Sequence, residues 1–222
     1  MHSVESVVEL LLLAVVLTDF AVLGSSRVSA CIRAVAVQGA LLGALSLFAD
    51  DPRLVRAVVL AVGTVIVKAV VLPWFLRRAI REAAVRREVE PRVGYMGSML
   101  LGAVALGVSF AVARRLPVGG PGVDGVGASS LLVPVALVTL IVGLLVLMTR
   151  SKAVTQVVGY LMLENGVYLF GLTQARRVPF LVEAGVLLDV LVAVFIMGIV
   201  VFHINREFDS ISAANLTALR ES

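Results

Sequence analysis

Long runs of apolar residues, each about the length of a membrane-spanning helix, divide this chain. A bilayer core of ~30 Å requires about 20 predominantly apolar residues per helix, and seven stretches of the sequence meet that requirement. None of them alternates between apolar and polar residues over about ten positions, as a membrane β-strand does. The pattern therefore predicts an all-α, polytopic integral membrane protein, with spans at 4–24, 28–48, 54–76, 95–113, 130–149, 153–173 and 180–203.

The composition points the same way. Hydrophobic residues make up 60% and charged residues 15% of the 222 positions, and the mean hydropathy is +1.05. Ordinary soluble domains are roughly 45–50% apolar and about 25% charged. A globule of this size cannot hide so much apolar surface from water. A soluble enzyme and a disordered tail are therefore excluded.

Basic residues are distributed unevenly between the two predicted sides of the membrane. One side carries 11 of them, six in the loop 77–92, whereas the opposite side carries 5. Cytoplasmic loops of membrane proteins carry an excess of lysine and arginine. We therefore expect the N-terminus outside and the C-terminus in the cytoplasm. The net charge of +4 is a topology signal on this interpretation, and no nucleic acid is expected as a partner.

A connector rich in glycine and proline, residues 114–129, separates two groups of predicted spans. This composition is typical of a flexible linker. We expect a four-helix membrane block at 1–113, a three-helix block at 130–203 and a cytoplasmic tail at 204–222. No internal repeat relates the two blocks, which argues against a transporter built from inverted repeats.

Few residues in this chain could hold a cofactor. Cys31 is the single cysteine, so neither an internal disulfide nor a thiolate cluster can form. The two histidines, His2 and His203, lie at opposite ends of the membrane portion. A haem held between two membrane histidines would need them at matching depth. We expect no metal, no cofactor and no independent catalysis.

Four ionisable residues inside the predicted spans stand out: Lys68, Glu164, Glu183 and Asp189. A charge at the bilayer centre costs roughly 2.5–3.5 kcal/mol on insertion scales. Helical rise places Glu164 ~16 Å from the cytoplasmic start of its span and Asp189 ~14 Å from the outer start of the next. Two carboxyls at one depth suit a proton relay, because desolvation and a like-charged neighbour both favour the protonated form.

Lys68 and Glu183 lie at other depths than this pair, and a structural role is open for all four residues. Lys68 lies ~21 Å into its span, where it can bind a carboxyl, join the relay or extend toward the membrane boundary. Pro73 frees a backbone carbonyl just beyond it. Glu183 lies about 240° around the helix from Asp189, as a boundary or packing residue. Buried carboxyls such as Glu164 can also simply hold helices together.

Two glutamines inside the spans, Gln38 and Gln156, are expected to form hydrogen bonds between helices.

Three segments of the chain resemble a known membrane-protein family. They are 156–166 (QVVGYLMLENG), 181–189 (LVEAGVLLD) and the tail 215–220 (NLTALR). Each is similar to the corresponding part of the hydrogenase-4 component E family, whose members are membrane proteins of formate hydrogenlyase and group 4 nickel–iron hydrogenase-like complexes. The lysine and proline at Lys68 and Pro73 also fit that family.

The resemblance implies a function and partners. The family's last three helices resemble the K component of respiratory complex I and the C component of multisubunit cation/proton antiporters. By that likeness Glu164, with either Asp189 or Glu183, belongs to a proton pathway; this chain has aspartate where the complex I relative has glutamate. The implied partners are antiporter-like membrane subunits and hydrogenase-like subunits in a bacterial or archaeal cytoplasmic (inner) membrane. The chain would be a non-catalytic subunit that couples redox chemistry to proton or sodium translocation.

Two alternatives stay open on the sequence. The chain can be a structural adaptor that holds antiporter-like subunits together without carrying protons. It can also be an autonomous transporter, although the missing repeat and the short loops argue against this.

Overall fold

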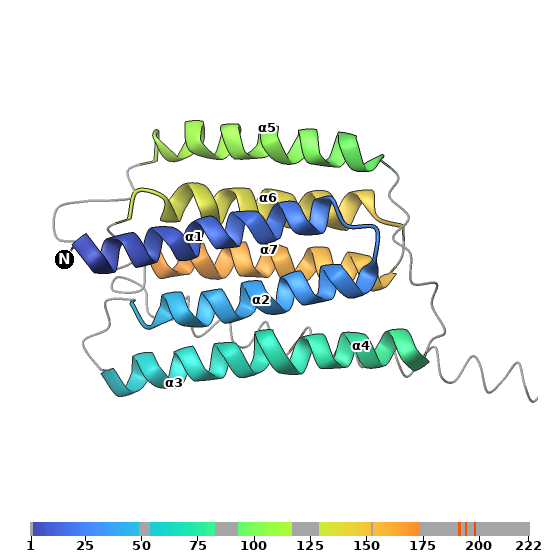
Figure 1. Cartoon of the computed structure of the whole chain (residues 1–222), viewed down its shortest axis with the longest axis horizontal. Coiled ribbons are helices and arrows are strands. Elements are labelled where there is room, and N and C mark those ends of the chain that lie inside the picture. Colours follow the sequence, from blue (N-terminus) through green and yellow to red (C-terminus); the bar gives the residue numbers. More distant parts are fainter. Residues whose placement is uncertain are drawn as a thin grey trace, which may run out of the picture.

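The computed structural model describes residues 2–48, 54–82, 93–116, 129–151 and 153–173, with Leu191, Val194 and Gly198 as separate helical positions. Every regular element in these ranges is helical (Figure 1). The elements are α1 (His2–Leu23), α2 (Val28–Ser46), α3 (Leu54–Thr64), η1 (Val65–Val71), α4 (Leu72–Glu82), α5 (Tyr95–Ala113), α6 (Leu132–Thr149) and α7 (Ala153–Thr173). The all-α prediction is confirmed for this part of the chain.

Four of the described helices are long and apolar enough to cross a membrane, namely Val4–Leu23 of α1 together with α2, α5 and α6. The first six predicted spans coincide with described helices to within a few residues, except the third. The seventh predicted span, the tail and most of the connector lie outside the described residues. Seven crossings, the orientation and the division into blocks therefore stay predictions.

The helix at the third predicted span is longer than expected. Helix continues without a break from Leu54 to Glu82 through α3, η1 and α4, so Arg77, Arg78 and Arg81 lie on a helix and not in a loop. The prediction of a loop beginning at residue 77 was wrong. Arginine has a high helix propensity, and these three side chains are exposed, so the helix carries on past its apolar part.

The middle of this long helix, η1, is a π-helical segment of seven residues. The backbone N–H of Leu72 donates to the carbonyl of Val67, five residues earlier. Pro73 follows directly; proline has no N–H, and in a regular α-helix its ring clashes with the carbonyl four residues before it. The wider turn accommodates the proline, and Lys68 lies at the centre of that turn.

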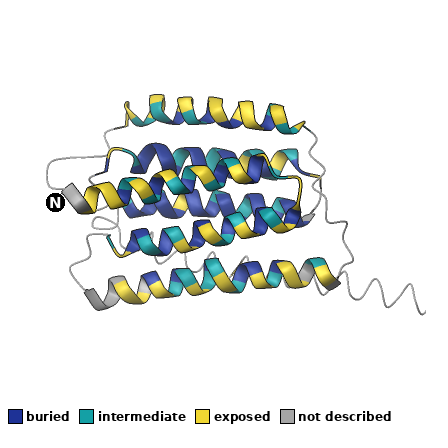
Figure 2. Cartoon of the chain, in the orientation of Figure 1, coloured by how far each residue is buried: buried dark blue, intermediate teal, exposed yellow. Residues whose placement is uncertain are grey.

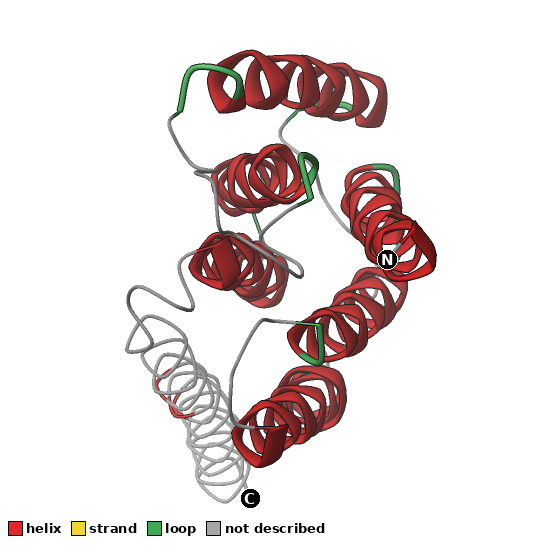
Figure 3. Ribbon diagram, turned by 90° about the vertical axis from the view of Figure 1, so that its left-hand side faces the viewer, coloured by secondary structure: helices red, strands yellow, loops and turns green. Residues whose placement is uncertain are grey.

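The helices form two layers. One layer runs α5, α6, α7; the other runs α1, α2 and the long helix α3–η1–α4 (Figures 1 and 3). Between the layers, α1 packs against α5 and α6, while α2 and α4 pack against α7. Helices from before and after the predicted connector therefore contact one another directly.

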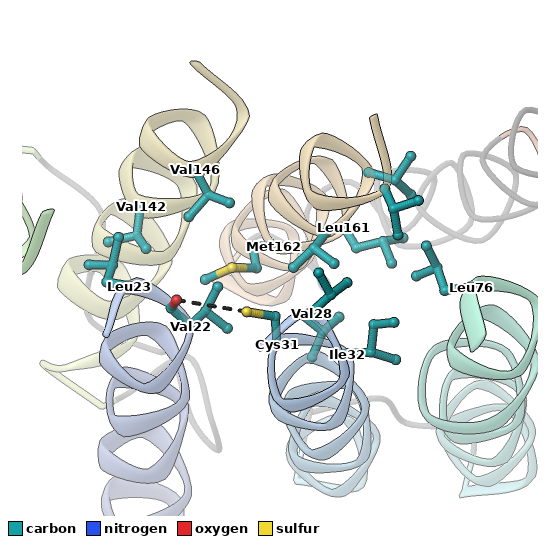
Figure 4. Close-up of a cluster of buried hydrophobic side chains, with 14 of the residues drawn as sticks. Val22, Leu23, Val28, Cys31, Ile32, Leu76, Val142, Val146, Leu161 and Met162 are labelled. Carbon is teal, nitrogen blue, oxygen red and sulfur yellow. Dashed lines mark hydrogen bonds between the residues drawn. The ribbon is translucent and has the colours of Figure 1, made fainter. Parts of the chain in front are cut away.

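Buried residues face the space between the layers and exposed residues face outward (Figure 2). Apolar side chains make up most of the buried set, and many large apolar side chains are also exposed. One buried cluster surrounds Cys31, whose thiol lies 3.9 Å from the carbonyl oxygen of Val22 (Figure 4). On the outside, Leu17 of α1 and Met96 of α5 are 71% and 85% exposed. Such an outer surface suits lipid and not water.

Close backbone approach ties α6 to α7. A methyl group on Gly159 would lie 2.5 Å from the backbone nitrogen of Leu147, and one on Gly166 would lie 2.5 Å from that of Leu140. Small residues at such positions let helices in a membrane pack tightly. This packing fixes the register of α7, which carries Glu164.

Candidate functional site

A buried ion pair joins η1 to α7. The Nζ atom of Lys68 lies 3.2 Å from Oε1 of Glu164, and the two side chains are 3% and 1% exposed. Removing two charges from water is costly, and their attraction offsets this only when they lie as close as they do here. The long, flexible stem of the lysine allows the ammonium to reach across from η1 to α7. The two residues are 96 positions apart in the sequence.

An aromatic ring lies beside the ammonium. The Nζ atom of Lys68 is 5.7 Å from the ring centroid of Tyr168, which is one helical turn after Glu164 in α7. The phenol oxygen of Tyr168 is 3.2 Å from Oγ1 of Thr64, which precedes η1. A cation over an aromatic face gains electrostatic energy that grows as water is excluded. The lysine is therefore bound by both an anion and a π-face of the same helix.

A glycine of α2 packs closely against the backbone of the lysine. A methyl group on Gly39 would lie 2.7 Å from Cβ of Lys68 and 2.8 Å from its carbonyl carbon. Gly43, one turn later, meets the side chain of Val65 at the start of η1 in the same way. This small-xxx-small spacing lets α2 approach the π-helical backbone. The position of Lys68 is thus set by backbone packing as well as by its charge.

A second buried polar group, which we call the Asp19 cluster, consists of Asp19, Gln38, Thr139 and Asn165. Nε2 of Gln38 donates to Oδ1 of Asp19 over 2.8 Å, and Oγ1 of Thr139 donates to Oδ2 over 2.8 Å. Nδ2 of Asn165 donates to Oε1 of Gln38 over 2.9 Å. Asp19 and Thr139 are fully buried, and the two amides nearly so. Four helices, α1, α2, α6 and α7, contribute one residue each.

The ion pair and the Asp19 cluster meet at two pairs of consecutive residues. On α2, Gln38 binds Asp19 while Gly39 contacts Lys68. On α7, Asn165 binds Gln38 while Glu164 binds Lys68. The two polar groups are therefore adjacent parts of one buried polar region between the layers.

A buried arginine marks one end of the bundle. Nη2 of Arg150 donates to the carbonyl oxygen of Leu23 at the end of α1 over 3.1 Å, and its guanidinium lies 5.7 Å from the ring centroid of Tyr95. Burial lowers the pKa of this guanidinium from its ordinary value. The sequence pattern predicts a loop residue on the basic side at this position, whereas the structure places the side chain inside the bundle, 2% exposed.

The structure brings together two of the four predicted site residues. Lys68 and Glu164 form an ion pair inside the bundle, and the side chain of Lys68 is 3% exposed. Asp189 and Glu183 lie outside the described residues, and their place beside Glu164 stays a prediction. Gln38 forms the expected bonds between helices.

Of the other residues considered, Gln156 binds the carbonyl of Arg150 over 3.1 Å across the short link from α6 to α7. Within the described ranges, no group of three or more histidine, cysteine or acidic residues could hold a metal ion.

Sequence reasoning missed Asp19. The signal was present, because Asp19 is an acid inside an apolar stretch and meets the same criterion that singled out Glu164. Its partners are neutral residues that attract no attention in a sequence, and Thr139 lies 120 positions away. A threonine in an apolar helix is ordinary unless its neighbours are known.

Comparison with known proteins gives one relative over most of the chain and others over part of it. The chain is 37% identical over 196 residues to "Uncharacterized protein Rv0085" of Mycobacterium tuberculosis, a match covering 86% of both chains. It is 36% identical over 86 residues to hydrogenase-4 component E of Escherichia coli K12, covering 39% of this chain and 40% of that protein. Hydrogenase-4 component E of Shigella flexneri matches to the same extent. No protein-family model and no solved structure matches the chain.

Proposed function

The chain belongs to the family of the mycobacterial protein Rv0085, and from this premise we propose that it is a non-catalytic membrane subunit of a hydrogenase-like oxidoreductase complex. In this proposal Lys68 and Glu164, with Asp189 or Glu183, form part of a proton pathway coupled to redox chemistry, with sodium as the alternative ion. The partial similarity to hydrogenase-4 component E supports the kind of complex. The four apolar helices support a place in the membrane.

The observation that carries the proposal is the ion pair between Lys68 and Glu164. Both charges are almost wholly buried in a bundle whose outer surface is apolar. Ionisable residues inside membrane segments are costly and typically mark ion pathways and proton relays. A well-packed apolar pair of similar volume would often give equal or greater stability. The pair also lies on a π-helical turn, and such turns are frequent at functional sites.

The pair can handle a proton through a change in its own charge balance. A proton that binds Glu164 leaves a neutral acid, and the ammonium of Lys68 then loses its anion while Tyr168 still faces it. The ammonium can then bind the carboxylate of another acidic residue. Asp189 or Glu183 is the proposed next carboxyl of the pathway, as the sequence predicts.

The remaining parts of the proposal concern topology and partners. The chain would cross a bacterial or archaeal cytoplasmic membrane seven times, with its N-terminus outside and its C-terminus in the cytoplasm. Its partners would be antiporter-like membrane subunits and the hydrogenase-like subunits of the same complex. Cysteine-labelling from either side of the membrane tests the topology independently of the function.

The decisive experiment replaces Glu164 by glutamine in the intact complex. Glutamine keeps the size and a hydrogen-bond acceptor but cannot carry a proton. We expect the complex to assemble and redox-driven proton translocation in membrane vesicles to fall at least tenfold. Ser109→Ala on α5 is the matched control, since it also alters a buried polar side chain. Normal translocation by an assembled Glu164→Gln complex would contradict the proposal.

A structural adaptor is the second candidate, and the hydrogen bonds among Asp19, Gln38 and Asn165 favour it. Polar side chains bonded across helices stabilise membrane bundles. An adaptor predicts that Glu164→Gln has no effect on translocation. It also predicts that Glu164→Leu, which leaves the lysine buried without its anion, prevents assembly.

A further inference from the structure

Asp19 is a carboxyl at the centre of a polar cluster that contains no basic residue. Its side chain is fully buried, and its two oxygens accept hydrogen bonds of 2.8 Å from Gln38 and Thr139. Within the described ranges no lysine, arginine or histidine forms an ion pair with it, in contrast to Glu164. A buried carboxylate with neutral partners alone is poorly compensated and favours the protonated form.

The described ionisable groups on α1 and on the elements packed against it do not supply a charged partner for the carboxyl of Asp19. Cys31 of α2 and Arg150 of the link after α6 each contact a backbone carbonyl in the last turn of α1, and Tyr95 of α5 lies against Arg150. The remaining ionisable side chains with described burial on these elements are exposed or partly exposed: Glu5, Glu9 and Arg33. The groups that touch the carboxyl itself are the neutral Gln38 and Thr139.

The two oxygens of Asp19 differ in what their partners permit. Oδ1 faces an amide N–H of Gln38, and Asn165 holds that amide in place by donating to its oxygen. An N–H can donate but not accept, so Oδ1 is poorly placed to carry a proton. Oδ2 faces the hydroxyl of Thr139, which can donate to a carboxylate or accept from a carboxylic acid after a rotation.

We propose that Asp19 is a second proton-binding site of this chain, in which Oδ2 takes up the proton and the Thr139 hydroxyl rotates to accept its hydrogen bond. The balance is simple: one proton binds one carboxylate, no other bond forms or breaks, and the charge changes from minus one to zero. The ligand is a proton. The site is distinct from the Lys68–Glu164 pair and adjoins it through the consecutive residues Gln38 and Gly39 of α2.

Gln38 and Asn165 connect this site to the ion pair. Each is adjacent in sequence to a residue that contacts or pairs with Lys68, namely Gly39 and Glu164. When Asp19 becomes neutral, its pull on the Gln38 amide weakens, since a hydrogen bond to a charged group is the stronger one. This change affects Asn165 as well, because Asn165 donates to the same Gln38 side chain. Asn165 is the direct neighbour of Glu164.

The experiment is a pH titration of the full chain in lipid bilayers. Infrared spectroscopy of the chain, with isotope-labelled aspartate, monitors the titration. The probe is the carbonyl stretch of a protonated aspartic acid. We expect this band in the unmodified chain and its loss in Asp19→Asn. Asp124→Asn, in the predicted connector 114–129 and outside the predicted spans, is the matched control and should keep the Asp19 band.

Thr139 supplies a second, independent measurement if Asp19→Asn does not fold. We expect Thr139→Val, which has nearly the same shape, to shift the band to higher wavenumber because the acid loses its hydrogen-bond acceptor. Thr139→Ser should restore the original position. A band that stays at its original position in Thr139→Val would overturn the assignment. A band that responds to added sodium at fixed pH would overturn it too, by showing that a metal ion occupies the site.

This inference goes beyond the proposed function and can fail separately. The infrared band reports a proton on Asp19 whether or not the complex translocates protons. Normal translocation in Glu164→Gln would overturn the proposed pathway and leave the Asp19 site standing. Loss of translocation in Glu164→Gln together with an absent Asp19 band would support the proposed pathway and overturn the Asp19 site.

Discussion

Glu164 and Asn165 are neighbours in α7, yet they bind different helices. Glu164 holds the ammonium of Lys68 on η1, whereas Asn165 donates to Gln38 on α2. Successive residues of an α-helix point about 100° apart, so one turn of α7 serves both polar groups. A change in either group therefore acts on the same short stretch of backbone.

The close approach of Gly39 to Lys68 gives the first prediction. Gly39→Ala should destabilise the protein by about 1–3 kcal/mol, because the added methyl group meets the backbone and Cβ of Lys68 and forces the helices apart. Thermal unfolding in detergent measures the effect. Gly63→Ala is the control, since a methyl group there has no neighbour within 4 Å among the described residues. Equal stability of the two variants would contradict this account of the packing.

Removal of one partner of the ion pair gives the second prediction. Lys68→Met should cost about 3–5 kcal/mol, because it removes the buried cation that forms an ion pair with Glu164. The double variant with Glu164→Gln should regain most of the lost stability. A double-mutant cycle of unfolding free energies tests this. Additive effects of the two changes would show that the residues do not interact.

The third prediction concerns the amide link. Asn165→Leu should destabilise the protein by about 1–3 kcal/mol, since it leaves the oxygen of Gln38 buried without a donor. The combination with Gln38→Leu should not restore stability, because Asp19 then loses a donor as well. Denaturant titration of single and double variants distinguishes this from the ion pair, where the double variant recovers.

Arg150 gives the fourth prediction. Arg150→Leu should loosen the end of the bundle, because the carbonyl of Leu23 loses its buried donor, with a cost of about 1–3 kcal/mol. Hydrogen exchange should rise at the end of α1 and at the start of α5, where Tyr95 lies against the guanidinium. Arg150→Lys keeps the charge but not the planar shape, and should protect these amides only partly.

Much of the fold could be predicted from the sequence, because membrane helices must satisfy their backbone hydrogen bonds internally and must be about as long as the bilayer is thick. Runs of apolar residues therefore located α1, α2, α5, α6 and α7 to within a few residues. The predicted third span ended at residue 76, because the apolar run ends where the arginines begin. The backbone hydrogen bonds of the helix continue to Glu82.

The site was predicted only in part. Helical rise placed Lys68 and Glu164 inside the membrane, but rise gives depth and not direction, so their ion pair required the packing of η1 against its neighbours. That packing depends on Gly39 and on the π-helical turn, and neither has a sequence signal specific enough to give an orientation. Asp19 became recognisable through Thr139 and Gln38, which are distant in sequence.

The turn that holds Lys68 contains more residues than an α-helical turn of the same rise. If this extra residue moved a few positions along the helix α3–η1–α4, every side chain between the old and new positions would rotate by about 100° around the helix axis. The helix itself would keep its length and its end points. Such a screw-like motion would carry the lysine away from its acid while exchanging a few backbone bonds, with no need to separate the two layers.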